Sequence, residues 1–233
     1  MTGHNEFDPV ADGKLAFEAA RDGGVAIFKA DVGYAIIGHT EEAIARIYEA
    51  KARSFSKPCG CFANWDLFNQ AIVADERARD FVSAVIHGEG LPLSIVGTFR
   101  PDHPVIANAA PYVRRNATKS GTIDLLLNAG PTHDEIARLA LATGVGIFGS
   151  SANRSLTGSK FVFEAIEPEV REAADLALDR GACRYSNEHG LGSTIIDLAS
   201  FEPIRIGICF DEIQAVADKA FGIHISSRIK RAL

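Results

Sequence analysis

Short apolar runs alternate with helical patterns along the whole chain, and this alternation predicts an α/β protein. Residues 25–28 and 34–37 are apolar runs of strand length, and a helix that a glycine pair ends precedes the first of them. Thr40 is a typical N-cap residue, and the apolar residues that follow it at helical spacing predict a helix ending near Lys51.

The same reading continues to the end of the chain. Pro131 suits the first turn of a helix that Gly144 ends, a second helix is predicted over residues 168–180, and a third begins near Asp211. No repeat and no Pro-, Gly- or Ser-rich linker divides the chain, so we predict one domain over residues 1–233. Its core spans about 15–210, and 211–233 is a helical and basic tail containing Arg228, Lys230 and Arg231. The predicted strands cover residues 25–28, 34–37, 93–99, 122–127, 145–148, 194–198 and 203–209.

Composition narrows the function classes. The 233 residues carry 30 acidic and 24 basic side chains, a formal net charge of -6, which argues against a protein that coats nucleic acid by charge alone. No apolar run approaches the roughly 20 residues of a membrane span. The four cysteines are too few for a disulfide scaffold, so we expect reduced thiols and a cytoplasmic protein. They also show no metal-ligand spacing, and we expect no metal bound by the protein itself.

A first candidate for binding is the basic segment that contains Lys51, Arg53 and Lys57. Cations this close repel one another unless an anion lies among them, and an arginine can hold a phosphate or carboxylate with two parallel hydrogen bonds. The alternative is that these cations complement the end of a helix and remain solvated.

Two further segments place hydroxyl and amide side chains next to strands. Ser151 and Asn153 follow an apolar run, which is where open α/β sheets often bind ligands, although the same composition is typical of a turn. Ser193 and Thr194 stand at the start of another strand and are candidate ligand contacts. The alternative is that this segment is only the entry to an edge strand with glycine turns. Arg205 lies among apolar residues and needs an anionic partner if it is buried.

Taken in order, these segments resemble the motifs of the YrdC/YciO family, from about Gly23 to about Gly207. Two of them, a Lys-x-Arg and a later Ser-x-Asn, lie about a hundred positions apart in the expected order. The matching segments are Lys51-Ala52-Arg53, Lys57-Pro58, Pro92-Leu93-Ser94, Ser151-Ala152-Asn153, residues 193–197 and Arg205-Ile206-Gly207.

The resemblance implies a single α/β domain with a twisted mixed sheet. It also implies synthesis of threonylcarbamoyl-adenylate from ATP, bicarbonate (or a carbamoyl donor) and an amino acid, for modification of tRNA. It assigns catalytic contacts to Lys51, Arg53, Ser151 and Asn153, and nucleotide contacts to Lys57, Ser193, Thr194 and Arg205. Mg²⁺ is expected with the ATP, and tRNA or tRNA-modifying proteins are expected partners.

The amino-acid half of the site departs from the family. Where the family has Pro-Thr-Asp-Thr-x-Tyr-Gly, residues 29–35 keep Asp31 and Tyr34 but neither threonine. The arginine understood to hold the threonine carboxylate falls at or near Leu126, and no Arg lies between residues 115 and 138. Asp31 and Tyr34 therefore remain candidate substrate contacts, with Lys29 as a replacement cation.

These departures leave two alternatives to the synthase. The first is a substrate-shifted homologue that forms another carbamoyl- or acyl-adenylate. The second is a non-catalytic module that binds double-stranded RNA or tRNA through a basic face, which the net negative charge disfavours.

Overall fold

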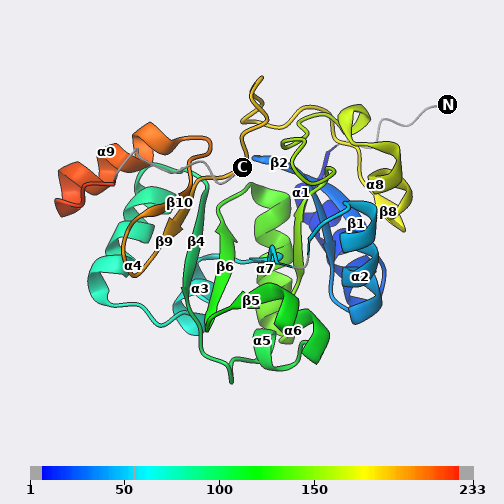
Figure 1. Cartoon of the computed structure of the whole chain (residues 1–233), viewed down its shortest axis with the longest axis horizontal. Helices are drawn as coiled ribbons and strands as arrows, with labels where there is room; N and C mark the ends of the chain where they lie inside the picture. Colours follow the sequence, from blue (N-terminus) through cyan, green and yellow to red (C-terminus); the bar gives the residue numbers. More distant parts are fainter. Residues whose placement is uncertain (1–6, 55, 226–233) are drawn as a thin grey trace.

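The computed structural model describes residues 7–54 and 56–225, and ten strands in this part of the chain form one sheet (Figure 1). The strands are β1 (Ala26–Ala30), β2 (Gly33–Gly38), β3 (Gly60–Phe62), β4 (Leu93–Thr98), β5 (Thr118–Lys119), β6 (Thr122–Leu127), β7 (Phe148–Ser151), β8 (Leu176–Ala177), β9 (Ile195–Asp197) and β10 (Pro203–Arg205).

The sheet is mixed. Its order is β10-β9-β4-β6-β3-β7-β2-β1-β8, with β5 paired to β6 off this path. The pairs β1/β8, β3/β6 and β4/β9 are parallel, and the remaining pairs are antiparallel. The predicted α/β fold with a twisted mixed sheet is therefore confirmed.

Helices lie on both faces of this sheet and at its two ends. In Figure 1, α4 and α9 lie at one end of the molecule, and α2 and α8 lie at the other. The helices are α1 (Pro9–Arg21), α2 (Glu41–Ala50), α3 (Trp65–Ala71), α4 (Glu76–Ser83), α5 (Pro104–Ala107), α6 (Pro111–Ala117), α7 (Pro131–Thr143), α8 (Pro168–Glu172) and α9 (Phe210–Phe221), with a π-helical turn at Ala84–Gly88 and a 3-10 turn at Phe163–Ala165.

Two hydrophobic clusters hold these layers together. Phe17 of α1 and Ile136 of α7 pack with Phe28 of β1 on one face of the sheet. Ile44 of α2 and Phe81 of α4 belong to the larger cluster on the other face. The strands alternate between these clusters as the two-residue period of a strand requires.

The main errors of the sequence prediction concern the ends of elements. The helix predicted over 168–180 is wrong after α8, because Asp175 accepts a hydrogen bond from Val25 N (2.7 Å) and the chain then pairs with β1 as β8. The strand predicted at 145–148 is shifted to β7, because small residues there let Gly149 lie directly against the Ile36 carbonyl. The helix predicted from residue 211 is confirmed as α9.

Three predictions about the whole chain have different outcomes. Arg228, Lys230 and Arg231 of the predicted basic tail lie outside the described residues. That residues 1–233 form a single domain stays a prediction. No helix within residues 7–54 or 56–225 is both long enough and apolar enough to cross a membrane.

Candidate functional site

Lys51 stands at the C-terminal end of α2, where the local sequence fixes its position. The Thr40 side chain caps the helix by accepting a hydrogen bond from Ala43 N (3.3 Å), and Glu41 and Glu42 favour its positive N-terminal end. The apolar face of α2 is buried against the sheet, so the helix delivers Lys51 to the ends of the central strands.

The Lys51 side chain is buried, with 1% of its surface exposed. Its ammonium group donates hydrogen bonds to the backbone carbonyls of Ser151 and Asn153. Burial, together with repulsion from the charge of Arg53, lowers the pKa of Lys51 to about 7, although the charge of Glu167 opposes the change. An anion placed beside this ammonium would favour its charged form.

The Ser-Ala-Asn segment closes around Lys51 from β7. The Ser151 hydroxyl donates to the Asn153 side-chain oxygen, and Ser155 N donates to the Lys51 carbonyl (2.9 Å). The Ser155 hydroxyl is shielded from solvent and has no hydrogen-bond partner in the described part of the chain. The structure thus brings Lys51, Ser151 and Asn153 together, and adds Ser155, which the sequence prediction missed.

Arg53 lies against the loop that follows α2. Its guanidinium donates to the carbonyls of Lys57 (3.2 Å) and Pro58 (2.6 Å) and lies over the Tyr48 ring, 5.7 Å from the centroid. The Lys57 side chain is exposed. The loop therefore holds Arg53 by its backbone, whereas a ligand contact by Lys57 stays a prediction.

A second arginine is held at the start of β9. Arg205 donates to the Ser193 carbonyl through Nε (2.9 Å) and Nη2 (2.7 Å), and to the Ser193 hydroxyl (2.9 Å). The Ser193 hydroxyl also lies 2.9 Å from that of Ser94 on β4. The Thr194 hydroxyl, in contrast, donates to Ile208 O (2.7 Å) and accepts from Gly207 N (3.1 Å), which is a structural contact.

Asp124 of β6 is a charged residue of the site that the sequence prediction missed. Burial raises the pKa of Asp124 to about 6, and the charges of Arg205 and Arg53 oppose that rise. Burial also lowers the pKa of Arg205, with repulsion from Arg53 adding to it. The three charged groups are thus close enough to act on one another. The signal in the sequence that could have identified Asp124 was an acidic residue within an otherwise apolar strand.

The residues predicted for the amino-acid pocket lie near a different segment, 179–185. The Tyr34 hydroxyl bonds to Asp179 Oδ1 (3.1 Å) and the Gly181 carbonyl (2.9 Å), and accepts from Arg180 N (3.0 Å). Lys29 Nζ donates to the Arg180 carbonyl (2.9 Å). These polar atoms are therefore already used within the protein.

Asp31 lies where β1 meets the loop before α7. Its backbone N–H donates to Ala129 O (2.7 Å), and its carboxylate lies 3.8 Å from Arg184. Burial raises the pKa of Asp31, and the charges of Arg184 and Lys29 oppose that rise. Asp31 remains a candidate contact at the edge of the site.

The loop after β7 lies against the loop before β9. Ser159 N donates to the Gly190 carbonyl (2.9 Å), and a Cβ at Gly158 would stand 3.1 Å from Gly190 Cα. A Cβ at Gly192 would lie 2.9 Å from the Ser159 hydroxyl and 3.4 Å from Arg205 Nη2. The segment after Asn153 thus reaches the arginine at the start of β9.

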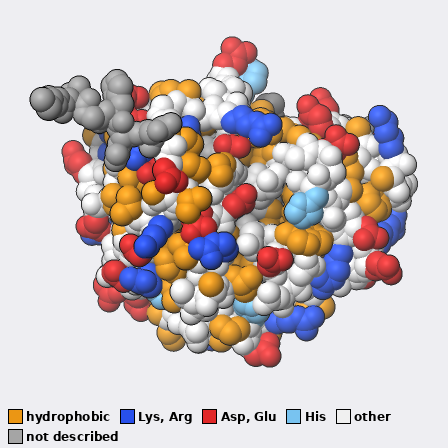
Figure 2. Space-filling view, turned by 180° about the vertical axis from the view of Figure 1, so that it is seen from behind, with side chains coloured by type: hydrophobic (Ala, Val, Ile, Leu, Met, Phe, Trp, Pro, Cys, Tyr) orange, Lys and Arg blue, Asp and Glu red, His pale blue; other side chains and the backbone are white. Residues whose placement is uncertain are grey.

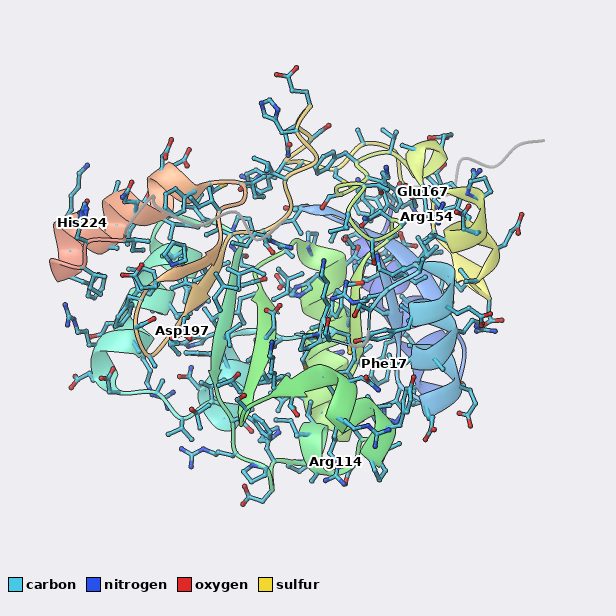
Figure 3. All side chains as sticks on the ribbon, viewed as in Figure 1. Phe17, Arg114, Arg154, Glu167, Asp197 and His224 are labelled. Carbon is cyan, nitrogen blue, oxygen red and sulfur yellow. The ribbon has the colours of Figure 1, made fainter. Side chains whose placement is uncertain are left out.

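Glu167 anchors the loop that follows Asn153. Glu167 accepts hydrogen bonds from Thr157 Oγ1 (2.7 Å) and Arg154 N (3.1 Å), and pairs with Lys160 at 3.1 Å. Arg154 and Glu167 lie near each other in Figure 3. Burial raises the pKa of Glu167, but these hydrogen bonds outweigh it and lower the pKa to about 2.

Among residues 7–54 and 56–225, no group of three or more His, Cys, Asp or Glu side chains is arranged to hold a metal ion. A separate hollow of about 390 Å³ lies beside α3, and its lining includes Trp65 and His87, whose rings pack edge to face with centroids 5.3 Å apart. It contains none of the predicted site residues.

A family model described as "Telomere recombination", Sua5_yciO_yrdC, matches residues 18–207, which is most of the chain. The chain belongs to the Sua5/YciO/YrdC family. This confirms the resemblance inferred from the motifs. The family match includes Lys51, Ser151, Asn153 and Arg205.

Relatives of the Sua5/YciO/YrdC family share this fold at low identity. A Methanocaldococcus jannaschii protein named "Putative threonylcarbamoyl-AMP synthase" is 26% identical over 188 residues, covering 79% of each chain. The structure of smu.1377c from Streptococcus mutans UA159 matches with a TM-score of 0.75 at 16% identity, covering 92% of this chain and 95% of that one. P. abyssi Sua5 complexed with L-threonine matches with a TM-score of 0.70 at 20% identity, covering 95% of this chain and 61% of that one.

Proposed function

We propose that the protein is an ATP-dependent enzyme of the threonylcarbamoyl-AMP synthase type that serves tRNA modification. It joins bicarbonate to the amine of an acceptor and attaches the resulting carbamate to AMP. In balance, R–NH₂, HCO₃⁻ and ATP give R–NH–CO–O–AMP, pyrophosphate and water. Membership of the family and the name of the M. jannaschii relative support this reaction class.

The observation that carries the proposal is the convergence of Lys51 with Ser151 and Asn153. The site contains a buried ammonium with a pKa near 7, and the loop that binds the Lys51 backbone also carries the shielded, unpartnered hydroxyl of Ser155. Such groups gain a partner when phosphate oxygens enter, because the ammonium regains a counter-charge and the hydroxyl a hydrogen bond. The described part of the site therefore fits a nucleotide phosphate.

The reaction requires positioning and charge neutralisation more than covalent chemistry by the protein. In this scheme Lys51 and Arg53 face the α-phosphate and the carbamate, and Ser151 and Asn153 orient the nucleotide. Arg205 and Ser193 contact the phosphates from β9. Mg²⁺ enters with ATP, since phosphates and water supply most of its ligands, and the described residues provide no separate metal cluster.

The test is release of pyrophosphate from MgATP and bicarbonate with a panel of amines that includes L-threonine. We expect release that depends on acceptor and bicarbonate, and a loss of about tenfold or more in Arg53→Ala, since a charge-assisted contact is worth about 1.5–3 kcal/mol. Arg77→Ala on α4 serves as control, because Arg77 is held to Phe221 O (2.9 Å) in a different part of the fold. Absence of ATP binding in calorimetry would refute the proposal.

One observation favours the substrate-shifted alternative. The half-buried positions of β6 include Asp124 and Leu126 and carry no cation, so a threonine carboxylate gains no partner from this strand. The panel distinguishes the two enzymes by the acceptor that releases pyrophosphate.

The surface charge disfavours the RNA-binding alternative. Figure 2 shows Lys and Arg side chains interspersed with Asp and Glu across one face, and the chain carries a net charge of -6. Salt-dependent binding of tRNA without ATP, together with no pyrophosphate release, would support that alternative instead.

A further inference from the structure

Asp124 lies on the face of β6 that does not belong to the larger hydrophobic core. Ile123, Leu125 and Leu127 are buried in that core, whereas Asp124 and Leu126 alternate with them and are half-buried on the opposite face, where Leu126 also packs against the smaller cluster. Successive side chains of a strand point to opposite faces, so Asp124 and Leu126 lie side by side about 7 Å apart along β6. Asp124 is thus the charged side chain on this face of β6.

The Asp124 carboxylate has no partner in the described part of the protein. Its Oδ1 atom is shielded from solvent and accepts no hydrogen bond, and no cation within residues 7–54 and 56–225 pairs with it. A Cβ at Gly60 on the neighbouring strand would stand 3.5 Å from Oδ2. An unpaired buried acceptor is costly, and such groups in native proteins call for an explanation.

The two nearby arginines do not supply the missing partner. Arg53 directs its Nε and Nη2 donors to the carbonyls of Lys57 and Pro58, and Arg205 directs the same donors to Ser193. Both arginines act on Asp124 through their charge without forming an ion pair with it. The carboxylate is therefore left to a group that arrives from outside.

The chemistry of that group follows from the charge of Asp124. A ligand carboxylate would meet a like charge on Asp124 and would find no cation on β6, while Arg53 and Arg205 already direct donors to backbone carbonyls. A nitrogen that carries N–H groups would satisfy the orphaned oxygen by a charge-assisted hydrogen bond.

We propose that Asp124 is the specificity-determining residue for the acceptor, and that it binds an N–H donor, a carboxamide or ammonium, at the end where an amino acid has its carboxylate. The inference rests on the proposed function, because it concerns the acceptor of the same reaction. The acceptor then carries two nitrogens: one becomes the carbamate, and the other is held by Asp124.

The test uses acceptors that differ only in the group facing Asp124. One series is L-threonine and L-threoninamide, and the other is glycine, glycinamide and ethylenediamine. Pyrophosphate release from MgATP and bicarbonate gives kcat/KM for each. We expect the carboxamide or the diamine to exceed the matching carboxylate by roughly tenfold or more; preference for the carboxylates would overturn the inference.

Two variants test the residue itself. Asp124→Asn keeps the shape and should bring the ratio between amide and carboxylate close to one, and Leu126→Arg should raise kcat/KM for the carboxylates. The matched control is Asp102→Asn, the same change at an exposed turn, which should keep the wild-type ratio. An unchanged ratio in Asp124→Asn would overturn the inference, and thermal unfolding checks that each variant is folded.

Calorimetry with MgATP separates this inference from the proposed function. If ATP binds and pyrophosphate is released equally from amides and carboxylates, the assignment of Asp124 fails and the enzyme proposal stands. If ATP does not bind, both fail. The ratio of kcat/KM between amide and carboxylate acceptors is measured on the wild-type protein. The test therefore still decides if a variant fails to fold.

Discussion

The Lys51 ammonium group donates a hydrogen bond to the backbone carbonyl of Asn153, 102 positions further along the chain. This bond ties the end of α2 to the loop after β7 and uses backbone acceptors in place of a carboxylate. Within residues 7–54 and 56–225 the ammonium is thus held by backbone carbonyls and by no carboxylate, so no anionic group of the protein neutralises it when it is protonated. A cation held in this way favours an anionic ligand.

Replacing Lys51 should separate binding from stability. In Lys51→Met we expect the affinity for ATP, measured by calorimetry, to fall by about 10- to 150-fold, since a hydrogen bond to a charged group is worth about 1.5–3 kcal/mol. The free energy of unfolding should change little or rise, because an apolar side chain of similar size often replaces a buried charge without loss.

The matched control is Lys14→Met on α1, whose side chain is 65% exposed. It should bind ATP as the wild type does. Equal ATP affinity in Lys51→Met and Lys14→Met would show that Lys51 does not contact the nucleotide.

Protonation of Lys51 should accompany ATP binding. Its pKa is lowered to about 7 in the free protein because of burial, so at pH 8 the amine is mostly neutral and an entering phosphate restores its charge. We therefore expect uptake of up to one proton at pH 8, measured by calorimetry in buffers of different ionisation enthalpy. Affinity should fall as pH rises above 7, and the uptake should be absent in Lys51→Met.

The lowered pKa of Lys51 also predicts how the free energy of unfolding of the ligand-free protein changes with pH. Between about pH 7 and the ordinary value of 10.5, the unfolded chain binds more protons at Lys51 than the folded protein does. The contribution of Lys51 to the free energy of unfolding should therefore rise with pH in this window. Chemical denaturation at pH 7 and 9 should show a smaller increase for Lys51→Met than for the wild type.

The sequence predicted the parts of the site that depend on local pattern and ordered motifs. The N-cap at Thr40 and the apolar face after it placed Lys51 at a helix end, and the resemblance associated it with Ser151 and Asn153. The sequence did not predict the partners of Tyr34, because they lie 145 to 147 positions away in a segment without periodic pattern. Contacts of that kind depend on which strands pair.

Asp124 was missed for a related reason. Its strand was correctly predicted at 122–127, but the face that each side chain takes follows from the pairing with β4 and β3. Three buried residues alternate with three half-buried ones, and only this alternation shows that the acid faces away from the core. An apolar strand with one acidic residue is thus a signal that needs the sheet for its interpretation.

Glu167 should control the order of the loop that closes on the site. In Glu167→Gln the carboxylate that holds Thr157, Arg154 and Lys160 loses its charge, and we expect about 1–3 kcal/mol less protection of the amides of residues 154–160 in hydrogen exchange. Glu164→Gln, an exposed acid on the adjacent 3-10 turn, is the control. Equal exchange in both variants would contradict the anchoring role.

Lowering the pH should weaken the same hydrogen bonds of Glu167. Glu167 has a folded pKa of about 2 and an ordinary value of 4.5, so its contribution to stability is present above pH 4.5 and is lost as pH falls toward 2. The protection factors of residues 154–160, which are corrected for the intrinsic exchange rate at each pH, should therefore fall over this range more in the wild type than in Glu167→Gln.

Gly207 should be intolerant of any side chain because two loops meet at its Cα. A Cβ there would stand 2.2 Å from the Gly192 carbonyl oxygen and 2.5 Å from the Ser193 carbonyl, and neither backbone atom can rotate away. Gly207→Ala should lower the free energy of unfolding by about 1–3 kcal/mol, as overpacking does. Because Ser193 also holds Arg205, the same change should weaken ATP binding. Gly88→Ala, where a Cβ meets nothing within 4 Å, should do neither. Denaturant unfolding and calorimetry on the two alanine variants decide the matter, and a Gly207→Ala protein as stable as Gly88→Ala would show that the two loops are free to separate.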